Sequence, residues 1–299
     1  MRVDWIKKTK EGIQVKDGSF YVDPIYPVKT AIITHGHADH ARAGHEHVIA
    51  TLETLEIMKE RYGNNFCKKS TELKYHEKLI IEEVEIFLAP AGHVLGSAQV
   101  VMNFANQVIT VSGDYKRQDD PTCAAFEPIK SDIFITEATF ALPVFKHPNA
   151  NTQINLLIKS IQNFPERCHV IGVYSLGKAQ RLIKMLRNNG WHNTIYLHGS
   201  LVKICNLYEK FGIDLGDLEP ATIQDKPEKP HDFYKGKLIL APPSALADRW
   251  SRRFPDPILG MASGWMTVKQ RAKQRGINLP LILSDHADWN EILTTIKEV

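Results

Sequence analysis

The stretch Thr34-His35-Gly36-His37-Ala38-Asp39-His40 follows directly on the apolar residues 31–33. It places three histidines and one aspartate within six residues, at the end of a segment that its apolar pattern predicts to be a β-strand. Imidazole and carboxylate groups are ligands that suit Zn, Mn and Fe. Ligands spaced in this way along one tight loop can reach two neighbouring ions, so the stretch predicts a metal centre.

Later segments repeat this arrangement, in which an apolar strand leads to a histidine or an acidic residue. The predicted strands are 84–88 before His93, 107–111 before Asp114, 132–136 before Glu137 and 280–283 before His286. Loops that follow strands often carry the functional residues of α/β proteins. Glycines beside His93 and Asp114 let the backbone approach an ion closely. Asp114 is a candidate bridge between two ions, and such a pair, about 3.5–4 Å apart, can clamp a phosphate and activate water.

Composition narrows the class of protein. The chain has 299 residues, of which 43% are hydrophobic, and this is enough for one large domain or two joined ones. Without an apolar run of membrane-spanning length or a signal segment, the sequence predicts a soluble cytoplasmic protein with no membrane partner. The four cysteines form no CxxC pair and are expected to be buried thiols in a reducing compartment. The net charge of +3 tolerates an anionic partner.

The chain changes character between about residues 150 and 255. A strand is predicted at 168–174, and after a helical segment further strands are predicted at 194–197 and 237–240. The stretch 219–236 is rich in Pro, Lys and Asp and is expected to be a surface loop. This alternation of strands and helices indicates a separate α/β module inserted into the first domain.

The order His-Gly-His-Ala-Asp-His, Gly-His and Gly-Asp resembles the signature of the metallo-β-lactamase fold. Later landmarks resemble those of the β-CASP nucleases, in which a cap domain is inserted into a metallo-β-lactamase core. These landmarks are Thr136–Phe140, Tyr174–Gln180, Ala241–Ser244 and Ser284–Asp288. Within this family the nearest likeness is to the bacterial ligase-associated DNA exonucleases, and it extends over residues 20 to 290.

The resemblance implies an α/β fold, namely a metallo-β-lactamase αββα sandwich with an inserted α/β β-CASP cap domain. We therefore expect the first part of the core at residues 1–150, the cap at 151–255 and a return to the core at 256–299. The family pattern continues with a Thr-His-Gly or Val-His-Gly motif, whose histidine is the last ligand of the second metal. Val299 precedes that motif, so the second metal is expected to be weakly held.

The resemblance also implies roles for individual residues around two divalent ions, Zn or Mn. The metal ligands are His35, His37 and His93 for one ion, Asp39 and His40 for the other, and Asp114 between them. Glu137 orients His286, which contacts the scissile phosphate and protonates the leaving oxygen. Asp39 is also a candidate for positioning the attacking water.

The cap is expected to hold the nucleic acid. Ser175 and Gly177 lie at a predicted helix start, where backbone N–H groups can bind phosphate. Lys178 and Arg181 add positive charge nearby. Ser244, which ends the landmark that begins at Ala241, is a further candidate for substrate binding.

The favoured hypothesis is a metal-dependent DNA exonuclease of DNA repair, acting on single-stranded DNA or on a free end. The family name implies a setting beside a DNA ligase and a helicase. Three alternatives stay open: an RNA-processing β-CASP ribonuclease, a small-molecule hydrolase, and a nucleic-acid-binding protein with an incomplete metal site. The inserted module and the Ser-Asp-His run at 284–286 argue against the small-molecule hydrolase.

Overall fold

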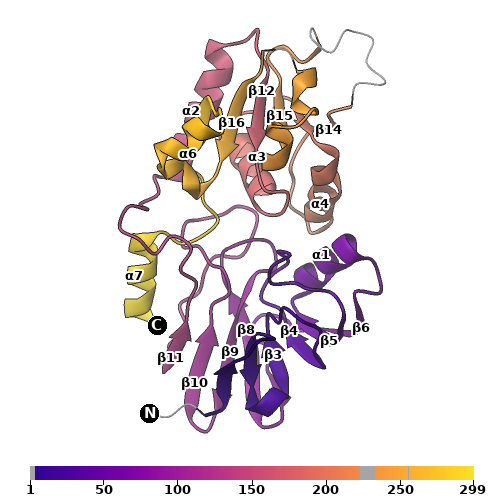
Figure 1. Cartoon of the computed structure of the whole chain (residues 1–299), viewed down its shortest axis with the longest axis vertical. Helices are drawn as coiled ribbons and strands as arrows, with labels where there is room; N and C mark the ends of the chain where they lie inside the picture. Colours follow the sequence, from indigo (N-terminus) through magenta and orange to yellow (C-terminus); the bar gives the residue numbers. More distant parts are fainter. Residues whose placement is uncertain (1–3, 223–232, 255) are drawn as a thin grey trace. The chain divides into compact units, whose positions relative to one another are not determined.

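The computed structural model of the protein describes residues 4–222, 233–254 and 256–299. The chain divides into two compact units, which Figure 1 shows in sequence colours. The first unit runs to Ala141 and also contains Asn290–Val299, whereas the second unit comprises Leu142–Trp289. The second unit is therefore an insertion in the chain of the first.

Two β-sheets form the body of the first unit. One sheet contains, in chain order, β1 (Ile6–Lys8), β2 (Ile13–Val15), β3 (Phe20–Val22), β4 (Thr30–Ile32), β5 (His45–Ala50) and β6 (Cys67–Glu72). The other has the order β11 (Ile133–Ile135), β10 (Gln107–Val111), β9 (Ala98–Phe104), β8 (Val84–Pro90) and β7 (Leu79–Ile81). Pairing is parallel from β3 to β6 and between β10 and β11, and the other pairs are antiparallel.

The main core of the first unit lies between these two sheets. Val84, Ile86 and Leu88 alternate along β8 and are fully buried, as expected when successive side chains of a strand point to opposite faces. They share one apolar cluster with Val22 and Ile49 from the other sheet. This packing brings the loops that follow β4, β8, β10 and β11 into one unit, and those loops carry the candidate ligands.

Helices complete the first unit. In α1 (Leu52–Tyr62), the side chain of the residue before the helix, Thr51, accepts the N–H of Thr54, and this caps the helix. The apolar face of α1 packs against β4 and β5 in a second cluster, so the helix covers a sheet face. A short 3-10 turn η1 (Lys16–Gly18) precedes β3, and α7 (Trp289–Glu298) returns the chain to this unit. The α/β class predicted from the sequence is confirmed.

A six-stranded parallel sheet forms the second unit. Its order is β14 (Leu218–Pro220), β13 (Ile195–Leu197), β15 (Leu238–Ala241), β12 (His169–Gly172), β16 (Ile258–Ala262) and β17 (Leu279–Leu281). Within the described residues its helices are α2 (Ala150–Asn163), α3 (Lys178–Asn188), α4 (Gly199–Lys210) and α6 (Lys269–Gln274), with 3-10 turns η2 (Pro243–Leu246), η3 (Ser251–Arg253) and η4 (Gly264–Thr267). The central strands β12 and β15 are buried throughout, as is usual for parallel sheets.

The unit boundaries differ from those expected at residues 150 and 255. Strand β16 pairs with β12, and β17 pairs with β16, so residues 256–289 extend the sheet of the second unit. The chain returns to the first unit only at Asn290. The physical reason is that β16 is an apolar strand buried at four of its five positions, and the neighbouring β12 covers one of its edges.

Three further expectations concern the loop at 219–236, membrane-spanning segments and the cysteines. The predicted loop at 219–236 overlaps β14 at its start, and its part from 223 to 232 lies outside the described residues. Among the helices of the described ranges, none combines the length and the apolar character needed to cross a lipid bilayer. Cys168 and Cys205 are buried free thiols, whereas Cys67 and Cys123 are only half-buried.

Candidate metal centre

The loop after β4 is shaped by hydrogen bonds to one carboxylate. Asp23 accepts the backbone N–H of Thr34 at 2.8 Å and its hydroxyl at 2.6 Å. The Thr34 hydroxyl oxygen also lies 3.0 Å from Nδ1 of the fully buried His35. A Cβ on Gly36 would lie 2.5 Å from a methyl group of Ile57, so only glycine fits where α1 passes under the loop.

A second tight turn follows β8 and presents His93. The Ser97 hydroxyl oxygen accepts the backbone N–H groups of both His93 and Val94, at 3.0 and 3.1 Å. Gly92 has a φ of 73°, and a Cβ there would lie 2.4 Å from the carbonyl oxygen of Lys116. The glycine is required at this position because a side chain would push the turn away from its neighbour.

The turn after β10 presents Asp114. Gly113 has a φ of 56°, and a Cβ there would lie 2.7 Å from Cβ of Thr34. The close approach brings the Asp114 turn against the histidine loop. Glu137, which follows β11, accepts the backbone N–H of Tyr115 at 2.8 Å and donates its own N–H to the Ser112 hydroxyl at 3.2 Å.

Ligand atoms from these loops converge on one point. Oδ2 of Asp114 lies 3.5 Å from Nε2 of His35 and 3.7 Å from Nε2 of His93. Nε2 of His93 is also 2.9 Å from Nδ1 of His37. One donor atom from each of these four residues lies within 4.8 Å of the others. Two ligand atoms on a tetrahedral zinc ion with bonds of about 2.0–2.1 Å are roughly 3.3 Å apart, so the spacing fits one shared divalent ion.

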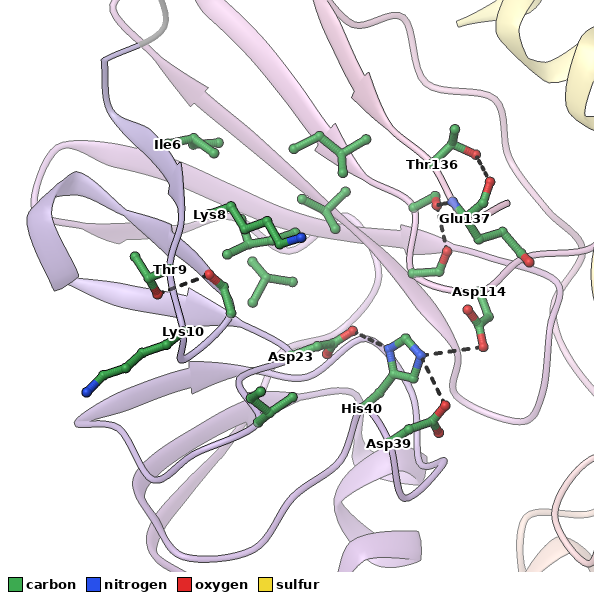
Figure 2. Close-up of a pocket in the computed structure, with 18 residues that line it drawn as sticks. Ile6, Lys8, Thr9, Lys10, Asp23, Asp39, His40, Asp114, Thr136 and Glu137 are labelled. Carbon is green, nitrogen blue, oxygen red and sulfur yellow. Dashed lines mark hydrogen bonds and ion pairs between the residues drawn. The ribbon is translucent and has the colours of Figure 1, made fainter. Parts of the chain in front are cut away.

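A second set of donors adjoins the first at Asp114. Nε2 of His40 lies 3.5 Å from Oδ2 of Asp114 and 3.9 Å from Oδ2 of Asp39 (Figure 2). Asp114 therefore faces both donor sets with the same oxygen atom, which is the position of a bridging ligand. The Asp39 side chain is 76% exposed, so this second set is more open to solvent than the first.

Asp23 holds His40 from behind, and sequence analysis did not single it out. Its Oδ2 lies 2.7 Å from Nδ1 of His40, which leaves Nε2 directed toward Asp114 (Figure 2). A carboxylate behind a ligating histidine fixes the tautomer and the ring orientation. The signal was available, because Asp23 follows the apolar strand Phe20–Val22 just as the predicted ligands follow theirs.

The pKa of His40 reflects two opposed influences. Burial disfavours the charged imidazolium, but the hydrogen bond to Asp23 and the negative charges of Asp23, Asp114 and Asp39 outweigh it. Together they raise the pKa of His40 to about 9. The carboxylates around this ring therefore favour a positive charge at this point, whether a proton or a metal ion supplies it.

A cavity of about 560 Å³ opens beside the second donor set (Figure 2). Asp39, His40, Asp114 and Glu137 form one part of its wall. Apolar residues, most of them on β1, β2, β3, β10 and β11, form much of the rest of the wall, and Lys8 and Lys10 contribute positive charge. The apolar residues are Ile6, Ile13, Val22, Ile25, Val111 and Ile135. All of these residues belong to the first unit.

His286 belongs to the second unit, in the loop between β17 and α7. Its backbone N–H donates to the Ser284 hydroxyl at 3.1 Å, and that hydroxyl donates back to the His286 carbonyl at 3.0 Å. These bonds make a tight turn that fixes the backbone at the histidine. The predicted orientation of His286 by Glu137 stays a prediction.

The predicted substrate-binding residues also lie in the second unit, and several are engaged there. The Gly177 N–H donates to Oε1 of Gln180 at 2.8 Å, so it already has a partner. Lys178 and Arg181 are buried against Asp285 rather than displayed to solvent. Ser175 is half-buried and Ser244 is exposed. Both basic residues therefore pair with a buried acid of their own unit, and their contact with phosphate stays a prediction.

Known proteins resemble this chain in sequence and in fold. No family model matches it. It is 25% identical, over 99% of its length, to a protein named Probable DNA ligase from Opitutus terrae, of which the match covers 28%. It is 29% identical over 206 residues, 56% of its length, to Endoribonuclease YSH1 from Gibberella zeae, of which 24% is covered. A solved protein of unknown function from Enterococcus faecalis V583 matches with a TM-score of 0.57 and 14% identity, covering 90% of this chain and 73% of that one.

These relatives confirm the resemblance to β-CASP nucleases and ligase-associated proteins that the motifs indicated. The chain spans about a quarter of the length of these curated relatives, 28% and 24%. The likeness to the Enterococcus protein, at 14% identity, shows the fold alone.

Proposed function

We propose that this protein is a metal-dependent hydrolase of phosphodiester bonds in nucleic acid. The observation that carries the proposal is the convergence of His35, His37 and His93 on Asp114, with His40 on the other side of that carboxylate. Imidazole and carboxylate donors at these spacings suit Zn or Mn. The sequence relatives support the same chemistry, because one is named an endoribonuclease and another a probable DNA ligase.

In the proposed site, His35, His37 and His93 would hold the first ion, and Asp39 and His40 would hold the second. Divalent ions bound here supply positive charge to the phosphate oxygens and lower the pKa of bound water. Asp114 would share its carboxylate between the two. We expect the second ion to be the more weakly held, because the Asp39 carboxylate is largely exposed to solvent.

The remaining steps belong to groups of the chain itself. Asp39, exposed at the wall of the cavity, orients the attacking water and accepts its hydrogen bond. Asp23 keeps His40 in one tautomer. His286 donates a proton to the leaving oxygen, and the negative charge of Glu137 favours the protonated ring, as the family resemblance implies.

We propose DNA as the substrate and an exonuclease of DNA repair as the role. The likeness to Probable DNA ligase extends over 99% of the chain, whereas the likeness to Endoribonuclease YSH1 extends over 56%. RNA processing is the second candidate, because the shorter likeness is to an endoribonuclease. In the DNA role the first unit is the metallo-β-lactamase core, the second unit is the β-CASP cap, and the partners are a DNA ligase and a helicase.

A matched cleavage assay tests the proposal. End-labelled single-stranded DNA and RNA of one sequence are incubated with the protein and Mn, Zn or a chelator. Stepwise shortening of DNA that the chelator stops is the expected result. Asp114→Asn should lower the rate by roughly 1,000-fold or more, because the shared carboxylate supports both ions.

The control is His76→Asn, at an exposed histidine of the first unit that lies 3.2 Å from Glu127. This variant should cleave like the unchanged protein. If RNA is cleaved and DNA is not, the proposed metal centre stands, but the substrate is RNA, as in the second candidate function. Chelator-resistant cleavage, or equal loss in both variants, would contradict the proposal.

A further inference from the structure

The loop that carries His286 is anchored to three neighbouring segments of the second unit. At its start, the Ile282 N–H donates to Oε1 of Gln153 in α2, at 2.9 Å. Near its end, Asp288 accepts the His147 N–H at 2.8 Å. The Trp289 N–H donates to the carbonyl of Phe145 at 3.1 Å. Both ends of the loop are thus fixed before the start of α7.

Its centre is fixed by a buried group of three charged side chains. Nζ of Lys178 lies 2.8 Å from Oδ2 of Asp285, and Nη1 of Arg181 lies 3.6 Å from Oδ1 of the same carboxylate. Nη1 of Arg181 also donates to the carbonyl of Ser284. The three side chains are 3%, 4% and 0% exposed for Lys178, Asp285 and Arg181. Lys178 begins α3, and Arg181 lies about one turn further along the same face of the helix.

Such a cluster is a costly way to stabilise a fold. Charges removed from water lose their hydration, and the attraction between them repays this loss only when the geometry is good. Its main structural consequence lies in the backbone, because Ser284 and Asp285 directly precede His286. Three contacts from a rigid helix, one to the Ser284 carbonyl and two to the Asp285 carboxylate, leave these residues little freedom to move.

We propose that Lys178 and Arg181 are positioning residues, which act through Asp285 and Ser284 to hold His286 in place for proton transfer. They do not act as phosphate ligands in this account. The inference rests on the proposed function, in which His286 is the proton donor. It assigns to the start of α3 a role in turnover instead of a role in affinity.

Lys178→Met tests the inference against the phosphate-binding alternative. Loss of positioning should lower kcat on the order of 100-fold, as a misplacement of about 1 Å can do, and leave KM unchanged. The salt dependence of DNA affinity and the bound metal content should also stay unchanged. A raised KM with a shallower salt dependence and an unchanged kcat would instead identify Lys178 as a phosphate contact and overturn the proposal.

The matched control is Lys184→Met on the same helix, where Nζ donates to the carbonyl of Asp214. It should leave kcat unchanged. If Lys178→Met does not fold, Asp285→Asn replaces it, because the amide keeps the volume of the carboxylate and one acceptor oxygen. The two substitutions combined should lower kcat little more than Asp285→Asn alone, since the contact that Lys178→Met removes is one of those that Asp285→Asn weakens. Additive losses would contradict the proposed link.

A measurement without substrate separates failure of this inference from failure of the proposed function. Histidine rings labelled with ¹³C give resonances by NMR, and His286→Ala identifies the signal of His286. Asp285→Asn should shift or broaden that signal while leaving the signal of His93 in place. If the unchanged protein cleaves no nucleic acid, the proposed function fails, and this spectrum still decides the inference. An unchanged His286 signal would overturn it.

Discussion

At the scale of single residues, the candidate metal centre follows from donor atoms whose spacing fits one shared ion. His35, His37, His93 and Asp114 were predicted from their places after strands, and the structure brings them together. Asp23 was missed although it follows strand β3, because no motif joins it to His40, 17 residues further along the chain. The pairing of the basic residues of α3 with Asp285 could not be predicted, because a charge in a sequence does not reveal whether a buried acid lies beside it.

Asp23 gives a residue-scale prediction about metal affinity. Asp23→Asn should keep the hydrogen bond from Thr34 and remove the charge behind His40. The affinity for the more weakly held ion should then fall by roughly 10- to 100-fold, the usual cost of losing such a support. Calorimetric titration of metal into the metal-free protein measures it.

The matched control is Asp17→Asn, at an exposed aspartate that pairs with Lys7 at 2.9 Å. Its titration should match that of the unchanged protein. Equal affinities for both ions in Asp23→Asn and in the unchanged protein would remove Asp23 from the metal centre.

At the scale of elements, the sequence located strands better than it located boundaries. The segments ending before His93, Asp114 and Glu137 are strands β8, β10 and β11, because alternating apolar residues and the turns after them are local signals. The assignment of 256–289 to a unit depended on pairing between β16 and β12, which are distant in sequence. Local patterns cannot reveal which sheet an apolar strand joins.

His169 on β12 gives an element-scale prediction about pH. Its side chain is fully buried, with Nε2 2.8 Å from the Ser160 hydroxyl of α2, and burial lowers its pKa to about 4. In the unfolded chain its pKa is about 6.5, so below that pH the unfolded state takes up the proton first. The second unit should therefore lose stability as the pH falls from about 6.5 to about 4, and keep the contribution of His169 above that range.

Urea unfolding followed by tryptophan fluorescence measures this loss, because Trp191, Trp250, Trp265 and Trp289 lie in the second unit and only Trp5 lies in the first. His169→Gln should lose less stability over this range than the unchanged protein does. His192→Gln, at an exposed position, is the control. Identical pH dependence in all three proteins would show that the pKa of His169 is the same in the folded and unfolded states, and it would refute the prediction.

At the scale of the whole molecule, the four converging donors His35, His37, His93 and Asp114 lie in one unit, and the proposed proton donor lies in the other. The α/β class could be predicted from the sequence because strand and helix patterns are local. The family likeness could be predicted because its motifs keep their order along the chain. The choice between DNA and RNA could not, because both polymers present the same phosphodiester to a metal centre.

The metal content of the purified protein decides whether the converging donors form a metal centre. Elemental analysis after dialysis without chelator should find a transition metal retained by the unchanged protein and by His76→Asn. The variant His35→Ala/His93→Ala, which removes two of the four converging donors, should retain none. Retention of the same amount of metal by that double variant, or of no metal by the unchanged protein even after Zn or Mn is supplied, would contradict the account.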